Sequence, residues 1–220
     1  FSTAISVTLL YATYYDKTDV YTCAMFLAFL GVYAVRRCRR PWLGLLLCGG
    51  CLCLSMGLYQ GYIEFAIGLF LLCLLRDCLT KELPWADYLR RGFTAVAALL
   101  LGSVLYAVSM KVVLAYKHLE LIDSYNGLQQ MGRGGVSVWL SRLPGAYKQV
   151  LSTLLDYDVW NNRGMRLATA VCLLLALACL VLILRRKPRR ALAQTAILLV
   201  LLPLGLNVVY LLSEKAPTLL

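Results

Sequence analysis

The chain has 220 residues and a mean hydropathy of +0.73, and 61% of its residues are hydrophobic, a share that hardly changes when Gly is counted in place of Tyr. Soluble domains hold about 45–50% apolar residues, so an ordinary water-soluble globular domain is not expected. The 22 Lys and Arg residues against 11 Asp and Glu give a net charge of +11, which in a polar chain would indicate a nucleic-acid partner. Because only 15% of the residues are charged, the positions of the basic residues decide what this excess means.

Apolar segments of membrane-crossing length recur along the whole chain. A transmembrane helix needs roughly 17–25 mainly apolar residues. The segments span residues 1–15, 20–35, 42–58, 62–75, 92–116, 165–184 and 191–212, with a short amphipathic piece between Pro84 and the fifth of them. The first resembles the end of a longer span and Phe1 is not an initiator Met, so we expect an N-terminally truncated fragment. The sequence therefore predicts an all-α polytopic membrane helical bundle of about seven spans, forming a single transmembrane domain over residues 1–220.

Basic residues gather in three connecting loops, at 36–40, 76–91 and 185–190, which together carry +10 of the net +11. Cytoplasmic loops of membrane proteins are enriched in Lys and Arg. Placing all three loops on the cytoplasmic side agrees with the alternation of the spans and puts residues 117–163 outside. The charge is then a topology signal with a possible second role toward anionic membrane lipid, and no nucleic-acid partner is predicted.

The nine cysteines all lie outside residues 117–163, the region where oxidising conditions would favour disulfides, so no disulfide framework is predicted. A C-x-x-C pattern begins at Cys48, but a zinc site usually needs four ligands and no second pair follows, so we interpret it as helix packing. Gly44 and Cys48, like Gly57 and Gly61, stand four residues apart, a spacing that lets membrane helices approach closely. This small-residue spacing predicts a tightly packed hairpin of the third and fourth spans.

Polar residues inside the spans are candidates for function because they are costly in lipid. Glu64 stands near the external end of the fourth span, where it is either a functional carboxylate or a solvated, hydrogen-bonded helix end. Lys111 can extend its ammonium to the external interface. In the last span, Asn207 and Pro203 predict a kink and an interhelical hydrogen bond.

The external region, residues 117–163, is predicted to be a loop that carries an interfacial helix. Apolar residues recur every three or four positions over residues 136–155, which predicts an amphipathic helix at the outer membrane surface, broken or kinked at Pro144. Glycines flank Arg133 without forming a P-loop, so this stretch is either a flexible turn or a phosphate contact.

Metal binding is left open by the acidic residues. His118 is the only histidine, so a metal site built mainly on imidazole is excluded. A carboxylate site for a divalent cation is compatible with the acidic residues predicted outside, which are Asp16, Asp19, Glu64, Glu120 and Asp123.

Several stretches of the sequence, spread in order over most of the chain, together resemble one family. They are YYD at 14–16, SMGLYQGY at 55–62 leading into FAIGL at 65–69, YNGLQQMG at 125–132 and LPGAY at 143–147. The sequence resembles the bacterial Gtr-type glucosyltransferases, multi-pass proteins of the cell membrane associated with O-antigen glucosylation. The resemblance implies a GT-C-like glycosyltransferase that moves glucose from a polyprenyl-phosphate carrier to a cell-surface glycan on the external face. It also implies that the main catalytic carboxylates belong to an external loop upstream of Phe1.

Two external elements are predicted to meet at the substrate, the hairpin at 59–64 and the loop at 117–135. We expect the sugar to be bound by Tyr59, Gln60 and Tyr62, with Tyr125 and Asn126. The phosphate would be held by Arg133 and Lys111, and the carboxylate within reach would be Asp123 or Glu64. Such roles fit the chemistry, because displacement at an anomeric carbon needs a base for the acceptor proton and a cation for the departing phosphate.

Three other functions remain open from the sequence. A transporter or flippase of a lipid-linked sugar would share the spans and the charge bias, but it should show internal repeats and a broken helix at mid-membrane, and no convincing repeat is present. A surface-glycan polymerase or ligase would also have a large external loop. A purely structural scaffold comes last, because the external region concentrates charge, Gly and aromatic residues.

Overall fold

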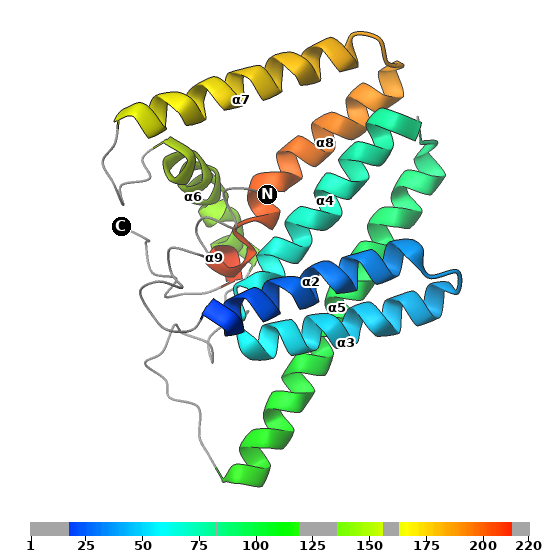
Figure 1. Cartoon of the computed structure of the whole chain (residues 1–220), viewed down its shortest axis with the longest axis vertical. Helices are drawn as coiled ribbons and strands as arrows, with labels where there is room; N and C mark the ends of the chain where they lie inside the picture. Colours follow the sequence, from blue (N-terminus) through cyan, green and yellow to red (C-terminus); the bar gives the residue numbers. More distant parts are fainter. Residues whose placement is uncertain (1–17, 82, 119–135, 156–162, 213–220) are drawn as a thin grey trace. The chain divides into compact units, whose positions relative to one another are not determined.

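A computed structural model describes residues 18–81, 83–118, 136–155 and 163–212 (Figure 1). All regular secondary structure in these ranges is helical, which confirms the predicted all-α fold. The helices are α2 (Thr18–Arg37), α3 (Pro41–Leu58), α4 (Tyr62–Lys81), α5 (Trp85–Lys117), α6 (Val136–Leu155), α7 (Arg163–Leu184), α8 (Arg189–Gly205) and α9 (Val208–Leu212).

Four of the described helices are long and apolar enough to cross a membrane, fewer than the seven predicted spans. The four segments are Asp19–Arg37, Pro41–Leu58, Trp85–Lys117 and Leu167–Leu184. Helix α4 has the length but carries four charged residues, and α8 has only 17 residues. The first predicted span lies outside the described residues. Over residues 171–179 every side chain of α7 is exposed although the segment is apolar, as expected for a helix surrounded by lipid.

Two predicted boundaries were wrong. The amphipathic piece after Pro84 and the fifth span form one helix, α5, because nothing between them interrupts the backbone ladder. The last predicted span is divided at Asn207 into α8 and α9. There the Asn207 Nδ2 donates to the Pro203 carbonyl at 3.1 Å, while the Asn207 backbone N–H binds the Leu204 carbonyl at 3.3 Å. In a continuing α-helix the Pro203 carbonyl would accept the Asn207 backbone N–H. Here it accepts the Asn207 side-chain amide instead.

Helix α6 has the predicted bounds, and its amphipathic pattern is confirmed as a helix. The helix continues through Pro144, so the first of the two predicted effects, a break, is wrong, and the second, a kink, stays a prediction. Ala146, two residues later, is fully buried, and α6 packs against α7, α8 and α9. Its position at the membrane surface stays a prediction.

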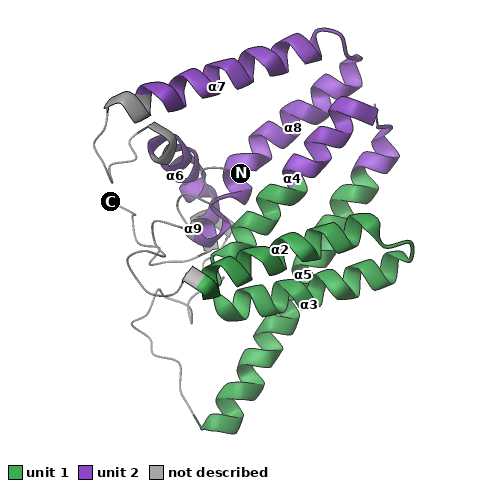
Figure 2. Cartoon of the chain, viewed as in Figure 1, with its two compact units in different colours: residues 1–70, 89–121 green, residues 71–88, 122–220 purple. Residues whose placement is uncertain are grey.

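The chain divides into two compact units, and α4 and α5 each begin in one and end in the other (Figure 2). Unit 1 is residues 1–70 and 89–121, and unit 2 is residues 71–88 and 122–220. The prediction of one transmembrane domain over the whole chain stays a prediction.

Small residues bring α2 and α3 together in unit 1. A Cβ atom added at Gly44 would lie 3.3 Å from the Ala34 carbonyl oxygen, and one at Gly31 would lie 3.2 Å from the Cys51 Cβ. Cys48 is buried at this contact, 3.3 Å from the same Gly31 position, as the packing interpretation of the C-x-x-C pattern predicts. All nine cysteines are free thiols.

The predicted partner of the small-residue pattern was wrong. Gly44 and Cys48 face α2, and a Cβ added at Gly57 would have no neighbouring atom within 4 Å. The spacing marks a surface that permits close approach, but it does not specify which helix approaches it. A second close contact joins α3 to α5, where a Cβ at Gly102 would lie 2.6 Å from the Leu52 Cβ.

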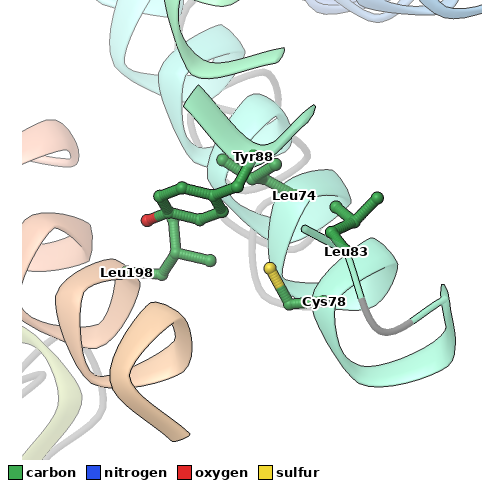
Figure 3. Close-up of a cluster of buried hydrophobic side chains, with 5 residues drawn as sticks. All are labelled: Leu74, Cys78, Leu83, Tyr88 and Leu198. Carbon is green, nitrogen blue, oxygen red and sulfur yellow. The ribbon is translucent and has the colours of Figure 1, made fainter. Parts of the chain in front are cut away.

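Unit 2 is built around an apolar cluster of larger side chains from α4, the start of α5 and α8. Its members are Leu74, Cys78, Leu83, Tyr88 and Leu198 (Figure 3).

Three side chains also bind backbone carbonyls across unit 2. Gln194 Nε2 donates to the Leu83 carbonyl at 3.0 Å, and the Tyr147 hydroxyl donates to the Val200 carbonyl at 2.7 Å. Asn207 Nδ2 donates to the Ala146 carbonyl of α6 at 3.3 Å, which confirms the predicted interhelical hydrogen bond.

Candidate functional site

The turn between α3 and α4 is short and closed by backbone hydrogen bonds. Tyr59 ends α3 in an extended conformation and donates its N–H to the Ser55 carbonyl at 2.9 Å. The carbonyls of Tyr59, Gln60 and Gly61 then accept from the first N–H groups of α4. A Cβ at Gly61 would lie 2.7 Å from the Tyr59 Cε1, so only glycine lets the Tyr59 ring lie this close to the turn. The turn is therefore a defined platform for the side chains it carries.

Four aromatic rings gather at this turn, and we call them the aromatic cluster: Tyr21, Tyr59, Tyr62 and Phe65. The Tyr59 centroid lies 5.0 Å from that of Tyr21 at 90° and 5.6 Å from that of Tyr62 at 70°. Tyr62 and Phe65 follow at 6.2 Å and 89°. Edge-to-face pairs of this kind are favourable and orient the rings. Tyr59 remains 50% exposed, so a fixed ring is presented at the surface of unit 1.

Gln60 connects the turn to α5. Its Nε2 donates a hydrogen bond to the hydroxyl of Tyr106, 46 positions later in the chain. One turn before the loop, the buried Ser55 hydroxyl donates to the Ala24 carbonyl of α2 at 2.7 Å. The turn is thus tied by polar contacts to the helices on either side of it within unit 1.

Four arginines of unit 1 stand at the opposite end of the α2–α3 hairpin from the aromatic cluster. Arg36, Arg37, Arg39 and Arg40 are all exposed. Arg40 directly precedes α3 and Tyr59 directly follows it, and an 18-residue helix is about 27 Å long. This length is close to the hydrocarbon thickness of a bilayer, about 30 Å.

The predicted charged residues are placed only in part. Glu64 lies partly buried in the first turn of α4, where a carboxylate interacts favourably with the helix dipole. Lys111 is exposed on α5, about 7.5 Å of helix rise beyond Tyr106. The predicted contacts of the external loop, Asp123, Tyr125, Asn126 and Arg133, lie outside the described residues.

A metal site is not formed by the part of the chain that the structure describes, because no three His, Cys, Asp or Glu side chains gather there. Asp19 lies in the first turn of α2, while Asp16 and Glu120 fall in ranges that are not described. A carboxylate site for a divalent cation therefore stays a prediction from the sequence.

Tyr21 and Tyr106 were not predicted as site residues. Tyr21 contacts Tyr59, which lies 38 positions later in the chain, and Tyr106 contacts Gln60, which lies 46 positions earlier. A weak signal exists for Tyr106, because a phenol in the apolar run of α5 needs a hydrogen-bond partner. Nothing in the sequence identifies that partner as Gln60.

Almost the whole chain, with the aromatic turn inside it, matches one known protein family. The family described as Glucosyl transferase GtrII matches residues 4–219. The chain belongs to this family. It is therefore a glycosyltransferase, and its apolar helices place it among membrane proteins. A transporter without chemistry, the strongest alternative from the sequence, does not fit this family. No curated protein and no solved structure matches the chain significantly.

Proposed function

We propose that the protein transfers glucose from a polyprenyl-phosphate carrier to a cell-surface glycan of the O-antigen type, on the external face of the cell membrane. The aromatic cluster and Gln60 would bind the sugar. The observation that carries this proposal is the fixed, half-exposed Tyr59 ring beside the Gln60 amide, at the end of the α2–α3 hairpin opposite its loop of arginines at 36–40.

A lipid-linked donor requires a sugar site at the end of the membrane-spanning helices. Its prenyl chain stays in the bilayer and its phosphate lies at the interface, so the sugar is met at the end of the spans. If the three basic loops at 36–40, 76–91 and 185–190 are cytoplasmic, the aromatic turn is external. Aromatic rings and an amide are suited to a sugar, because one supplies an apolar surface and the other a donor and an acceptor.

The transfer step makes one bond and breaks one at the anomeric carbon, and it moves one proton. The acceptor hydroxyl oxygen attacks the anomeric carbon, and the bond from that carbon to the phosphate oxygen breaks with its electron pair on the phosphate. The hydroxyl proton passes to a carboxylate, for which Asp123 and Glu64 are the proposed bases in this chain. Arg133 and Lys111 are proposed to neutralise the departing phosphate, with Tyr125 and Asn126 beside the sugar. Glu64 is the member of this set closest in the chain to the aromatic turn.

The test compares two donors in membranes that contain the complete protein. Radiolabelled polyprenyl-phosphate glucose is supplied in one arm and a nucleotide-linked glucose in the other, each with the glycan acceptor. We expect label in the glycan from the lipid-linked donor without any nucleotide sugar. Transfer from the nucleotide sugar alone, in membranes that cannot make the lipid-linked donor, would contradict the proposal.

A further inference from the structure

We propose that Tyr106 and Tyr21 are positioning residues for the glucosyl ring of the lipid-linked donor. In this inference the Tyr106 hydroxyl orients the Gln60 amide toward the sugar hydroxyls, and Tyr21 holds the Tyr59 ring against the apolar face of the sugar. The inference rests on the proposed function, because it assigns roles within the same site.

The bond between Gln60 and Tyr106 determines which amide groups are left for a ligand. An amide side chain has two N–H donors and a carbonyl oxygen that accepts. One donor of Gln60 is used by the Tyr106 hydroxyl. This bond leaves the second N–H and the carbonyl oxygen of the amide for a ligand, and a donor with an acceptor suits sugar hydroxyls, which donate and accept. Without the Tyr106 hydroxyl, the amide would be free to rotate and would lose this orientation.

Tyr21 has the corresponding role for the ring of Tyr59. The two rings stand at 90° with their centroids 5.0 Å apart, and Gly61 leaves room for the Tyr59 ring on the turn. The Tyr59 ring is thus restrained by α2 and by the turn while half of the residue stays exposed. The face of an aromatic ring is electron-rich and attracts the weakly positive C–H groups of a pyranose. A ring restrained before binding loses less entropy when the sugar packs on it.

An aromatic belt at the membrane surface is the alternative explanation for these tyrosines. A belt needs amphipathic rings at the interface but no particular hydrogen bond between them. Replacing Tyr106 by Phe removes one oxygen atom and keeps the ring, so it separates the two explanations.

The decisive experiment is a double-mutant cycle on donor kinetics with the complete protein in membranes. Tyr106→Phe should raise the KM for polyprenyl-phosphate glucose by about 3- to 10-fold with little change in kcat, as expected for one lost positioning hydrogen bond. Gln60→Ala should raise it at least as much. The double variant should match Gln60→Ala alone, because the two residues act through one bond.

Variants of α2 provide the second readout and the control. Tyr21→Leu removes the edge-to-face pair with Tyr59 and should raise the donor KM by about 3-fold or more. Tyr33→Phe removes a phenol oxygen from an exposed tyrosine nearer the arginine end of α2, and it should have no effect.

The possible failures are distinguishable. If the unmodified protein does not transfer glucose from the lipid-linked donor, the proposed function is wrong and this inference fails with it. If that transfer occurs but Tyr106→Phe leaves the donor KM unchanged, or if the Tyr106 and Gln60 effects are independent, the inference alone is overturned. A change confined to the KM for the glycan acceptor would also overturn it.

Discussion

The two units of the chain differ in which contacts between helices stand out. In unit 1, glycines at the α2–α3 and α3–α5 contacts let backbones approach closely, with Gly31, Gly44 and Gly102 each against a neighbouring helix. In unit 2, Gln194, Tyr147 and Asn207 donate hydrogen bonds to backbone carbonyls across larger apolar side chains. Lipid offers no hydrophobic force between helices, so close packing and interhelical hydrogen bonds are the available sources of stability. Unit 1 also has the buried hydrogen bond from Ser55 to the Ala24 carbonyl, so hydrogen bonds serve both units and the glycine contacts of α2, α3 and α5 are what set unit 1 apart.

This difference predicts that added volume harms unit 1 most. Gly102→Ala should lower the free energy of unfolding by about 1–3 kcal/mol, because the new Cβ would stand 2.6 Å from the Leu52 Cβ, which cannot rotate away. The free energy is measured by denaturant unfolding in detergent.

Gly50→Ala is the matched control in the same unit. A Cβ at Gly50 meets nothing within 4 Å, so this variant should be neutral or gain up to about 1 kcal/mol from helix propensity. Equal losses in both variants would mean that the close α3–α5 contact is not the source of stability.

Loss of a hydrogen bond should matter most in unit 2. Gln194→Met keeps a similar volume but leaves the Leu83 carbonyl without its amide donor, and it should cost about 1 kcal/mol. The same unfolding measurement applies. An unchanged stability would show that apolar packing around Leu198 holds α8 without help from the amide.

The neighbouring Thr195 should respond with the opposite sign. Its hydroxyl is buried and has no hydrogen-bond partner among the residues that the structure describes. Thr195→Val keeps the shape and removes this polar atom, so stability should stay the same or rise by up to about 1 kcal/mol. A clear loss would reveal that the hydroxyl has a partner after all, and would weaken the contrast with Gln194.

The sequence predicts the elements of this fold better than their partners. Apolar length and the amphipathic pattern of residues 136–155 identify helices because these signals are local. A kink was predicted at Pro203 and Asn207, but the division into two helices was not, because it depends on a side chain competing for the Pro203 carbonyl. The small-residue spacing marks a packing surface but not the helix that uses it, so α2 was missed as the partner of Gly44.

The candidate site follows the same rule. Tyr59, Gln60 and Tyr62 were predicted from one short motif, and the structure brings their rings and amide into one turn. Tyr21 and Tyr106 come from other helices, and only the folded chain brings them to that turn. The roles of Asp123 and Arg133 stay predictions, since both residues lie outside the described ranges.

Binding of the sugar by the aromatic turn can be tested by comparing the transfer rates of two variants. Glucose transfer from polyprenyl-phosphate glucose is measured at a donor concentration below KM for Tyr59→Ala and Tyr33→Ala, normalised to the amount of folded protein. The two tyrosines are equally exposed, at 50%, but only Tyr59 belongs to the turn. We expect about a tenfold loss for Tyr59→Ala and no loss for Tyr33→Ala. Equal rates for the two variants would contradict sugar binding by the turn.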